Sequence, residues 1–280
     1  MRRRLLVLVV IALIIWGVVL LIGRLSGPAS APADEYPDDL TEQSPYSDEG
    51  SERVSYYAND RQISPAVNLD AWYLILVNPW HALPVDFSVE LEHVPGSGGF
   101  YVDARITDSI VLMFAAALEV GIRLELRSAY RSVNRQYELF YGNVDMLVNQ
   151  GNTRERAVYL TEMYFARPGY SEHHTGLAVD ILSHDHQYFT AAFENTQAFA
   201  WLSENAHLFG FILRYPRDGR DITGIAYEPW HFRYVGQQAA LEIFETGMIL
   251  EQFLDPNRQQ AGSAAQAEGD EDDGNGYEEE

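Results

Sequence analysis

Two acidic segments limit how much of this 280-residue chain can fold into a core. Residues 34–52 contain eight acidic residues and no basic ones, together with several Pro, Ser and Gly. Residues 258–280 are small or polar at first and then strongly acidic. Such segments bury too little apolar surface to offset the entropy lost on ordering. We therefore expect an acidic flexible linker over 25–65, one domain over 66–257 and a disordered acidic tail over 258–280.

The N-terminus predicts where the protein resides. Arg2, Arg3 and Arg4 precede an uncharged apolar run over residues 5–22, which as a helix would span roughly 27 Å. Basic residues beside a membrane helix favour the cytoplasmic side. Residues 1–24 are therefore expected to form a cytoplasmic stub and a single-pass anchor in the cell membrane, with the domain outside the cell. Cleavage of a signal peptide near residues 31–33 is the alternative, although the apolar run is long for one.

Composition excludes several classes of function. The net charge of -22 argues against a nucleic-acid partner, because binding to phosphate backbones requires a basic surface. The chain has no cysteine, which rules out disulfides, thiolate metal ligands and a cysteine nucleophile. Any metal site must therefore be built from His, Asp or Glu.

Hydrophobic periodicity and helix-capping residues predict an α+β domain with a mostly antiparallel sheet and helices packed on one side. Helices are expected over 107–120, 132–148, 153–165, 196–207 and 237–253. Strands are expected over 74–77, 122–127, 177–182, 211–215 and 224–227.

Two short segments carry the candidate chemistry, residues 171–180 and 228–231. They supply His173, Asp180 and His231, and two imidazoles with one carboxylate can hold zinc and leave a position open for water. Glu228 is a second carboxylate that can accept a proton from that water. Each segment alone is a weak signal, since a lone histidine is more often structural. His174, or the pair His184 and His186, remain alternative ligands.

Strand alternation places Asp180 and Ala178 on one side of the predicted strand and Val179 on the other. The small residue at 178 leaves room beside an ion. Pro229 disfavours a helix through residue 228, so a tight turn is expected to present Glu228 and His231 together.

These motifs, with others before them, resemble a known family. The resemblance spans roughly residues 70–245, and it rests on Ser-x-His-x-x-Gly-x-Ala-x-Asp at 171–180, Glu-Pro-Trp-His at 228–231, Ser-Ala-Tyr-Arg-Ser at 128–132 and Gln136. The chain is similar to the VanY-type D-alanyl-D-alanine carboxypeptidases, zinc peptidases of family M15 that trim peptidoglycan stem peptides.

The resemblance implies a role for each matching residue. His173, Asp180 and His231 would bind one zinc ion, and Glu228 would act as general base. Arg131 would stabilise the oxyanion or bind a substrate carboxylate. Further substrate contacts would come from Ser171, Gln136 and Tyr215.

The implied function is a zinc-dependent, membrane-anchored carboxypeptidase that removes the C-terminal D-alanine from peptidoglycan stem peptides. D,D-carboxypeptidase and L,D-carboxypeptidase activities are both compatible with the motifs. A non-catalytic, zinc-containing cell-wall-binding domain is the alternative, but Glu228 would then have little purpose. An anchored scaffold with accidental motifs is a third possibility, which zinc analysis would test.

Overall fold

The computed structural model describes residues 67–255. The predicted anchor, the linker and the acidic tail fall outside these residues, as do the outermost residues of the predicted domain. Among residues 67–255, none of the helices has the length and apolar character needed to cross a membrane.

A four-stranded antiparallel sheet forms the centre of the domain. Its strand order is β3-β4-β6-β5, and every neighbouring pair is antiparallel. The strands are β3 (Leu124–Ser128), β4 (Ala178–Ser183), β5 (Phe211–Leu213) and β6 (His231–Tyr234). A separate hairpin pairs β1 (Leu91–His93) with β2 (Tyr101–Asp103). The expected α+β class with a mostly antiparallel sheet is therefore confirmed.

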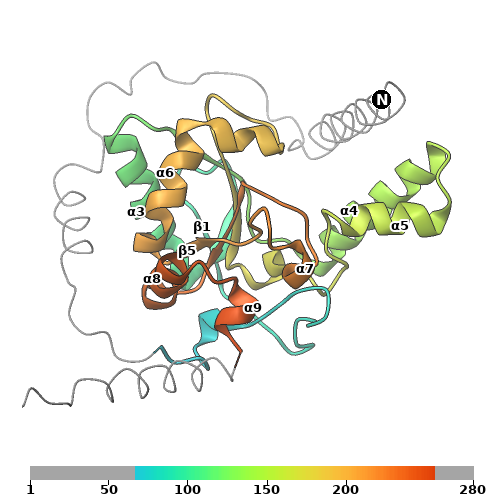
Figure 1. Ribbon diagram of the computed structural model, residues 1–280, viewed down its shortest axis with the longest axis horizontal. Coiled ribbons are helices and arrows are strands. Elements are labelled where there is room, and N and C mark those ends of the chain that lie inside the picture. The colour runs from blue at the N-terminus through green and yellow to red at the C-terminus, as the bar shows by residue number, and fades with distance from the viewer. Residues whose placement is uncertain (1–66, 256–280) are drawn as a thin grey trace, which may run out of the picture.

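Three helices begin directly after capping residues that the sequence predicts, whereas the helix that begins at Thr107 has no side-chain cap. Ser132, Thr153 and Thr196 each accept a hydrogen bond from a backbone N–H in the first turn. Figure 1 shows α3, α6 and α8 on one side of the molecule, with α4 and α5 extending away from it. The helices are α3 (Thr107–Glu119), α4 (Val133–Asn149), α5 (Arg154–Glu162), α6 (Gln197–Asn205), α7 (Arg220–Thr223), α8 (Gln237–Thr246) and α9 (Leu250–Phe253).

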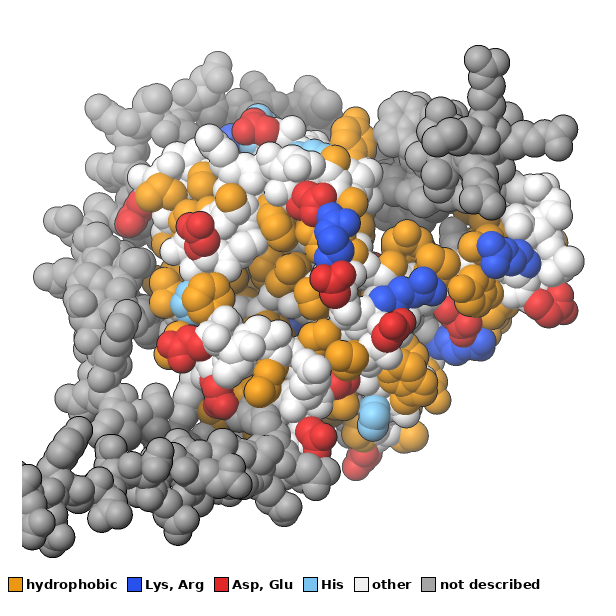
Figure 2. All heavy atoms as spheres, in the orientation of Figure 1, with side chains coloured by type: hydrophobic (Ala, Val, Ile, Leu, Met, Phe, Trp, Pro, Cys, Tyr) orange, Lys and Arg blue, Asp and Glu red, His pale blue; other side chains and the backbone are white. Residues whose placement is uncertain are grey.

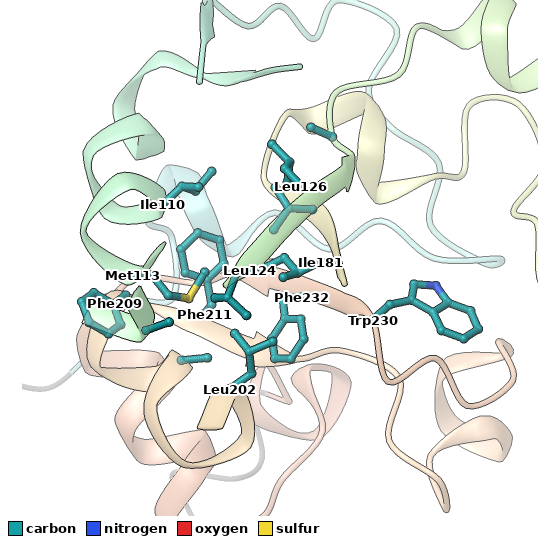
Figure 3. Packing of buried hydrophobic residues seen from close by; sticks show 14 of the residues in the cluster. Ile110, Met113, Leu124, Leu126, Ile181, Leu202, Phe209, Phe211, Trp230 and Phe232 are labelled. Carbon is teal, nitrogen blue, oxygen red and sulfur yellow. The ribbon is translucent and has the colours of Figure 1, made fainter. Parts of the chain in front are cut away.

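The two faces of the sheet have different contents. Val179, Ile181 and Phe232 are fully buried in the main hydrophobic core, where they pack with residues of α3 and α6 (Figure 3). Asp180 and His231 alternate with these residues and therefore lie on the opposite face. That second face carries the polar site described below.

The helical hairpin of α4 and α5 has its own small apolar cluster. Its fully or nearly fully buried members are Phe140, Val144, Leu147 and Ala157.

On the outer surface, Figure 2 shows arginine side chains next to acidic ones on the visible face, rather than gathered into a basic patch.

Two predicted strands are wrong. Leu74 ends a short 3-10 helix, Trp72–Leu74, and residues 75–77 form no strand. The carbonyls of Tyr73 and Ile75 accept hydrogen bonds from the side chain of Arg233 instead of from a strand. Residues 224–227 form a loop after α7, where Ala226 N–H donates to the carbonyl of Met163. In both segments, backbone groups that would pair with a neighbouring strand in a sheet form hydrogen bonds with other partners instead.

Other helix and strand boundaries also differ from those that the hydrophobic periodicity predicts. The helix expected over 237–253 is interrupted by Gly247, whose φ of 67° ends α8 before α9 begins. The short strands β1, β2 and β6 were not predicted, because three or four residues give too little alternation to be recognised.

Gly176 joins the polar face to the β-hairpin. Its φ is 74°, its carbonyl accepts a hydrogen bond from Asp103 N–H, and an added Cβ would lie 2.6 Å from that nitrogen. Gly176→Ala should therefore lower the free energy of unfolding by about 2–4 kcal/mol, through backbone strain and overpacking. Urea denaturation in a chelating buffer measures this loss.

Gly247→Ala is the matched control for this prediction. Gly247 also has a positive φ, of 67°, but an added Cβ would meet no atom within 4 Å. Its loss should be about 1–2 kcal/mol, from strain alone. Equal losses in the two variants would show that the close approach to Asp103 does not matter.

Candidate active site

Adjacent strands bring two of the predicted ligands together. Asp180 on β4 is directly opposite His231, the first residue of β6. On its other side, Asp180 is opposite Ser128 at the end of β3, next to a shift in register. Paired residues project from the same face of a sheet, so the carboxylate and the imidazole meet.

The third predicted ligand comes from the segment before β4. His173 lies in a short 3-10 helix, Glu172–Thr175, which ends at the left-handed Gly176. His173 Nδ1 is 2.8 Å from the carbonyl oxygen of Ala129, so this nitrogen carries the hydrogen and donates it. Nε2 is left with a free lone pair, 3.4 Å from Asp180 Oδ2.

The three side chains form a set suited to a metal ion. Ligand atoms of His173, Asp180 and His231 all lie within 4.8 Å of one another, and all three residues are buried. His231 Nδ1 is 3.1 Å from Asp180 Oδ1, which is buried and has no hydrogen-bond partner among residues 67–255. Two imidazole nitrogens and a carboxylate oxygen fit zinc, which accepts such mixed ligands.

Burial and mutual charge shift the pKa values of these ligands. Burial lowers the pKa of His173 to about 3, so its ring is neutral. Burial alone would raise the pKa of Asp180, but His173, His231 and Arg131 outweigh it and hold the pKa at about 2. Burial alone would lower the pKa of His231, but Asp180 and Glu172 raise it to about 9. A metal ion binding His231 must therefore displace a proton.

Glu228 is next to the three ligands. A turn between β5 and β6 places its carboxylate 3.7 Å from His231 Nδ1, and His231 N–H donates to the carbonyl of Glu228. Burial, only partly opposed by His231 and Arg131, raises the pKa of Glu228 to about 8. The expected tight turn is confirmed, and the carboxylate has a pKa suited to proton transfer near neutral pH.

Arg131 reaches the same face from the loop after β3. Its guanidinium donates to Gln136 Oε1 at 2.9 Å and to Ser128 Oγ at 2.8 Å, and it lies 3.9 Å from Asp180 Oδ2. Burial, opposed by Asp180 and Glu228, lowers its pKa from the usual value. The site therefore contains a fixed cation beside the ligands and the carboxylate of Glu228.

Comparison with known proteins decides the family. The model of the family "VanY: D-alanyl-D-alanine carboxypeptidase" matches residues 99–237. A D-alanyl-D-alanine carboxypeptidase of Enterococcus faecalis is 40% identical over 187 residues, which are 67% of each chain. The chain belongs to the VanY family.

Two solved structures agree with this assignment. A VanY D,D-pentapeptidase from a VanB-type vancomycin-resistance cassette, solved with Zn(II), is 39% identical with a TM-score of 0.60. That match covers 66% of this chain and all of the other chain. VanYB in complex with D-alanine-D-alanine has the same identity and TM-score, and the match covers 66% of this chain and 99% of the other.

The remaining predicted contacts of this VanY-family chain lie around the same face. Gln136 is buried and bridges Arg131 to the carbonyl oxygen of Ala166, to which its amide donates at 2.6 Å. The ring of Tyr215 is 4.7 Å from that of His231, and burial raises the pKa of its hydroxyl well above the usual value. Ser171 is buried two residues before His173. Gln136 thus fixes Arg131, and substrate contact by these residues stays a prediction.

The alternative histidine ligands have other partners. His174 Nδ1 is 2.6 Å from the carbonyl oxygen of Arg131, and its Nε2 accepts from Gly169 N–H, so neither nitrogen is free. His184 pairs with Glu125 near the surface, and His186 contacts Thr190. Of His173 and these alternatives, only His173 belongs to the set of residues that could hold a metal ion within 67–255.

Sequence reasoning missed the residues behind His231. Glu172 lies 3.3 Å from His231 Nε2 and makes ion pairs with Arg214 and Arg233. Burial alone would raise the pKa of Glu172, but the two guanidinium groups hold it below its usual value. A possible signal was the position of Glu172, inside the motif and directly before a ligand.

Proposed function

We propose that this chain is a zinc-dependent D-alanyl-D-alanine carboxypeptidase that removes the C-terminal D-alanine from peptidoglycan stem peptides. The convergence of His173, Asp180 and His231, with Glu228 beside them, is the observation that carries the proposal. One related structure is a complex with Zn(II), and another is a complex with D-alanine-D-alanine. A wall-binding domain with a structural ion would have no use for a buried carboxylate beside the three ligands.

The chemistry can be assigned to this chain's residues. His173, Asp180 and His231 would hold one zinc ion, which supplies Lewis acidity and lowers the pKa of water. Glu228 accepts the proton of the attacking water and delivers it to the amine of the departing D-alanine. Arg131 donates to a substrate oxygen that gains negative charge, or to the terminal carboxylate, with its orientation fixed by Gln136 and Ser128.

Arg131→Lys should reduce kcat/KM by about 10²–10³-fold, because a lysine lacks the planar fork that contacts Gln136, Ser128 and a substrate oxygen together. Steady-state release of D-alanine measures the change. Arg135→Lys is the control, since this partly exposed arginine pairs with Glu138 on α4. Comparable activities for the two variants would remove Arg131 from the mechanism.

The substrate test uses the full chain, purified in detergent and loaded with zinc. Muropeptides that end in D-Ala-D-Ala should release one D-alanine, and those that end in a single D-alanine measure any L,D-carboxypeptidase activity. Release of D-Ala-D-Ala as a dipeptide would instead indicate a dipeptidase. Release from neither substrate would overturn the proposed function.

For localisation, we propose a single-pass protein of the cell membrane with its catalytic domain outside the cytoplasm. The support is the sequence of residues 1–24, where three arginines precede an uncharged apolar run. The chain should fractionate with membranes at full length, and protease added to intact spheroplasts should degrade the domain. Recovery of a shortened chain from the medium would favour cleavage and secretion.

A further inference from the structure

A cluster of buried charges lies behind His231, on the side away from Asp180. Glu172 Oε1 accepts from Arg214 Nε at 2.7 Å and from Arg233 Nη1 at 2.8 Å. The side chains of Glu172, Arg214 and Arg233 are all 0% exposed. Taking three charges out of water costs several kcal/mol for each ion, so such a cluster persists only where its geometry is well satisfied.

The cluster extends to the C-terminal helix of the domain. Glu251 on α9 pairs with Arg214 through two hydrogen bonds, of 2.9 and 2.6 Å, and also accepts from Asn78. Two carboxylates then balance two guanidinium groups. Arg233 also donates to the carbonyl oxygens of Tyr73 and Ile75. The cluster thus links Glu172 to four other parts of the fold: the 3-10 helix Trp72–Leu74, the segment that follows it before β1, β6 and α9.

The two carboxylate oxygens of Glu172 have different partners. Oε1 is shared by both guanidinium groups, whereas Oε2 lies 3.3 Å from His231 Nε2. A carboxylate can only accept, so it favours the imidazole tautomer with hydrogen on Nε2. The lone pair of Nδ1 is then directed at the other two ligands. Partners of this kind orient metal-binding histidines and raise their affinity.

We propose that Glu172 is the positioning residue for His231, and that Arg214, Arg233 and Glu251 hold its carboxylate in place for this task. Helix α9 thereby contributes to metal affinity without contacting a ligand. The proposal rests on the proposed function, since it assumes that His231 binds the metal. If the cluster served only stability, substitutions in it would change the free energy of unfolding but not the orientation of the His231 ring.

Glu172→Gln is the sharpest variant. Glutamine has the same shape, and if its carbonyl oxygen stays with the arginines, its amide faces His231 Nε2 and favours the wrong tautomer. Zinc affinity, measured by competition with a chromophoric chelator, should fall about 10- to 100-fold. Glu138→Gln is the control, because it removes an exposed carboxylate whose partner is Arg135 on α4. A folded Glu172→Gln chain with zinc affinity within twofold of the unchanged chain would overturn the proposal.

Two further measurements decide the matter if Glu172→Gln does not fold. Glu251→Gln changes the outer end of the cluster and should weaken zinc binding about threefold or more, less than a direct partner of His231 would. In the unchanged zinc-loaded chain, ¹⁵N-histidine NMR should show His231 with hydrogen on Nε2 and metal on Nδ1. Metal on Nε2, or unchanged affinity in Glu251→Gln, would count against the cluster's role.

The measurements of zinc binding also distinguish failure of the positioning role from failure of the proposed function. If the unchanged chain binds no zinc, the hydrolase assignment fails, and the positioning role fails with it. If the unchanged chain binds zinc and hydrolyses substrate while both variants bind zinc as tightly, only the positioning role fails.

Discussion

Glu228→Gln should lower kcat for D-alanine release by about 10²–10⁴-fold while one zinc ion stays bound to each chain. The amide has nearly the shape of the carboxylate but cannot take a proton. Glu228 lies 3.7 Å from His231 Nδ1 and is absent from the set of three ligands, so the metal should keep its full ligand set. Steady-state kinetics together with elemental analysis of zinc measure both parts of this result.

Glu162→Gln is a suitable control for Glu228→Gln. Glu162 is a partly exposed residue at the end of α5 that pairs with Arg167, and its replacement should leave kcat unchanged. If Glu228→Gln retains the activity of this control, Glu228 does not transfer the proton. If it loses zinc as well as activity, Glu228 belongs to the metal ligands instead.

His173→Ala should abolish both stoichiometric zinc binding and hydrolysis. Removing one of three protein ligands leaves His231 and Asp180, which is fewer than a stable zinc site uses. We expect zinc affinity to fall by more than the roughly 10- to 100-fold that loss of an outer partner causes. Chelator competition and elemental analysis measure the loss, and circular dichroism checks that the chain is folded.

His174→Ala, at the adjacent histidine, is the control for His173→Ala. Both of its ring nitrogens are engaged, one with the carbonyl oxygen of Arg131 and the other with Gly169 N–H. Its replacement should keep one zinc ion per chain, whatever it does to stability. Loss of zinc in His174→Ala with retention in His173→Ala would reverse the assignment of the ligand.

The site was more predictable from the sequence than the fold that carries it. Metal ligation requires particular side chains at fixed spacing, so His173, Asp180 and His231 were found from two short motifs and lie together as expected. Alternation along residues 177–182 also gave the correct face for Asp180. The spacing within each segment is local, but the two segments had to be read together to indicate a metal site.

Features that depend on distant partners were missed. Residues 74–77 have the apolar character of a strand, yet the carbonyls of Tyr73 and Ile75 bond to Arg233, about 160 positions later in the sequence. Arg214 and Arg233 were not among the predicted site residues, although both are fully buried against Glu172. Burial of a charge is decided by its partners, and a single sequence does not display which residues those are.

The direct pairing of Asp180 with His231 restricts where the chain can change length. A deletion of Ala178 would turn the carboxylate of Asp180 toward the apolar core and Val179 toward the polar face, because strand side chains alternate. A deletion of one residue in the turn between α4 and α5 would alter neither strand. Length variation is therefore tolerable at that hairpin, whereas within β4 even one residue would eliminate the metal site.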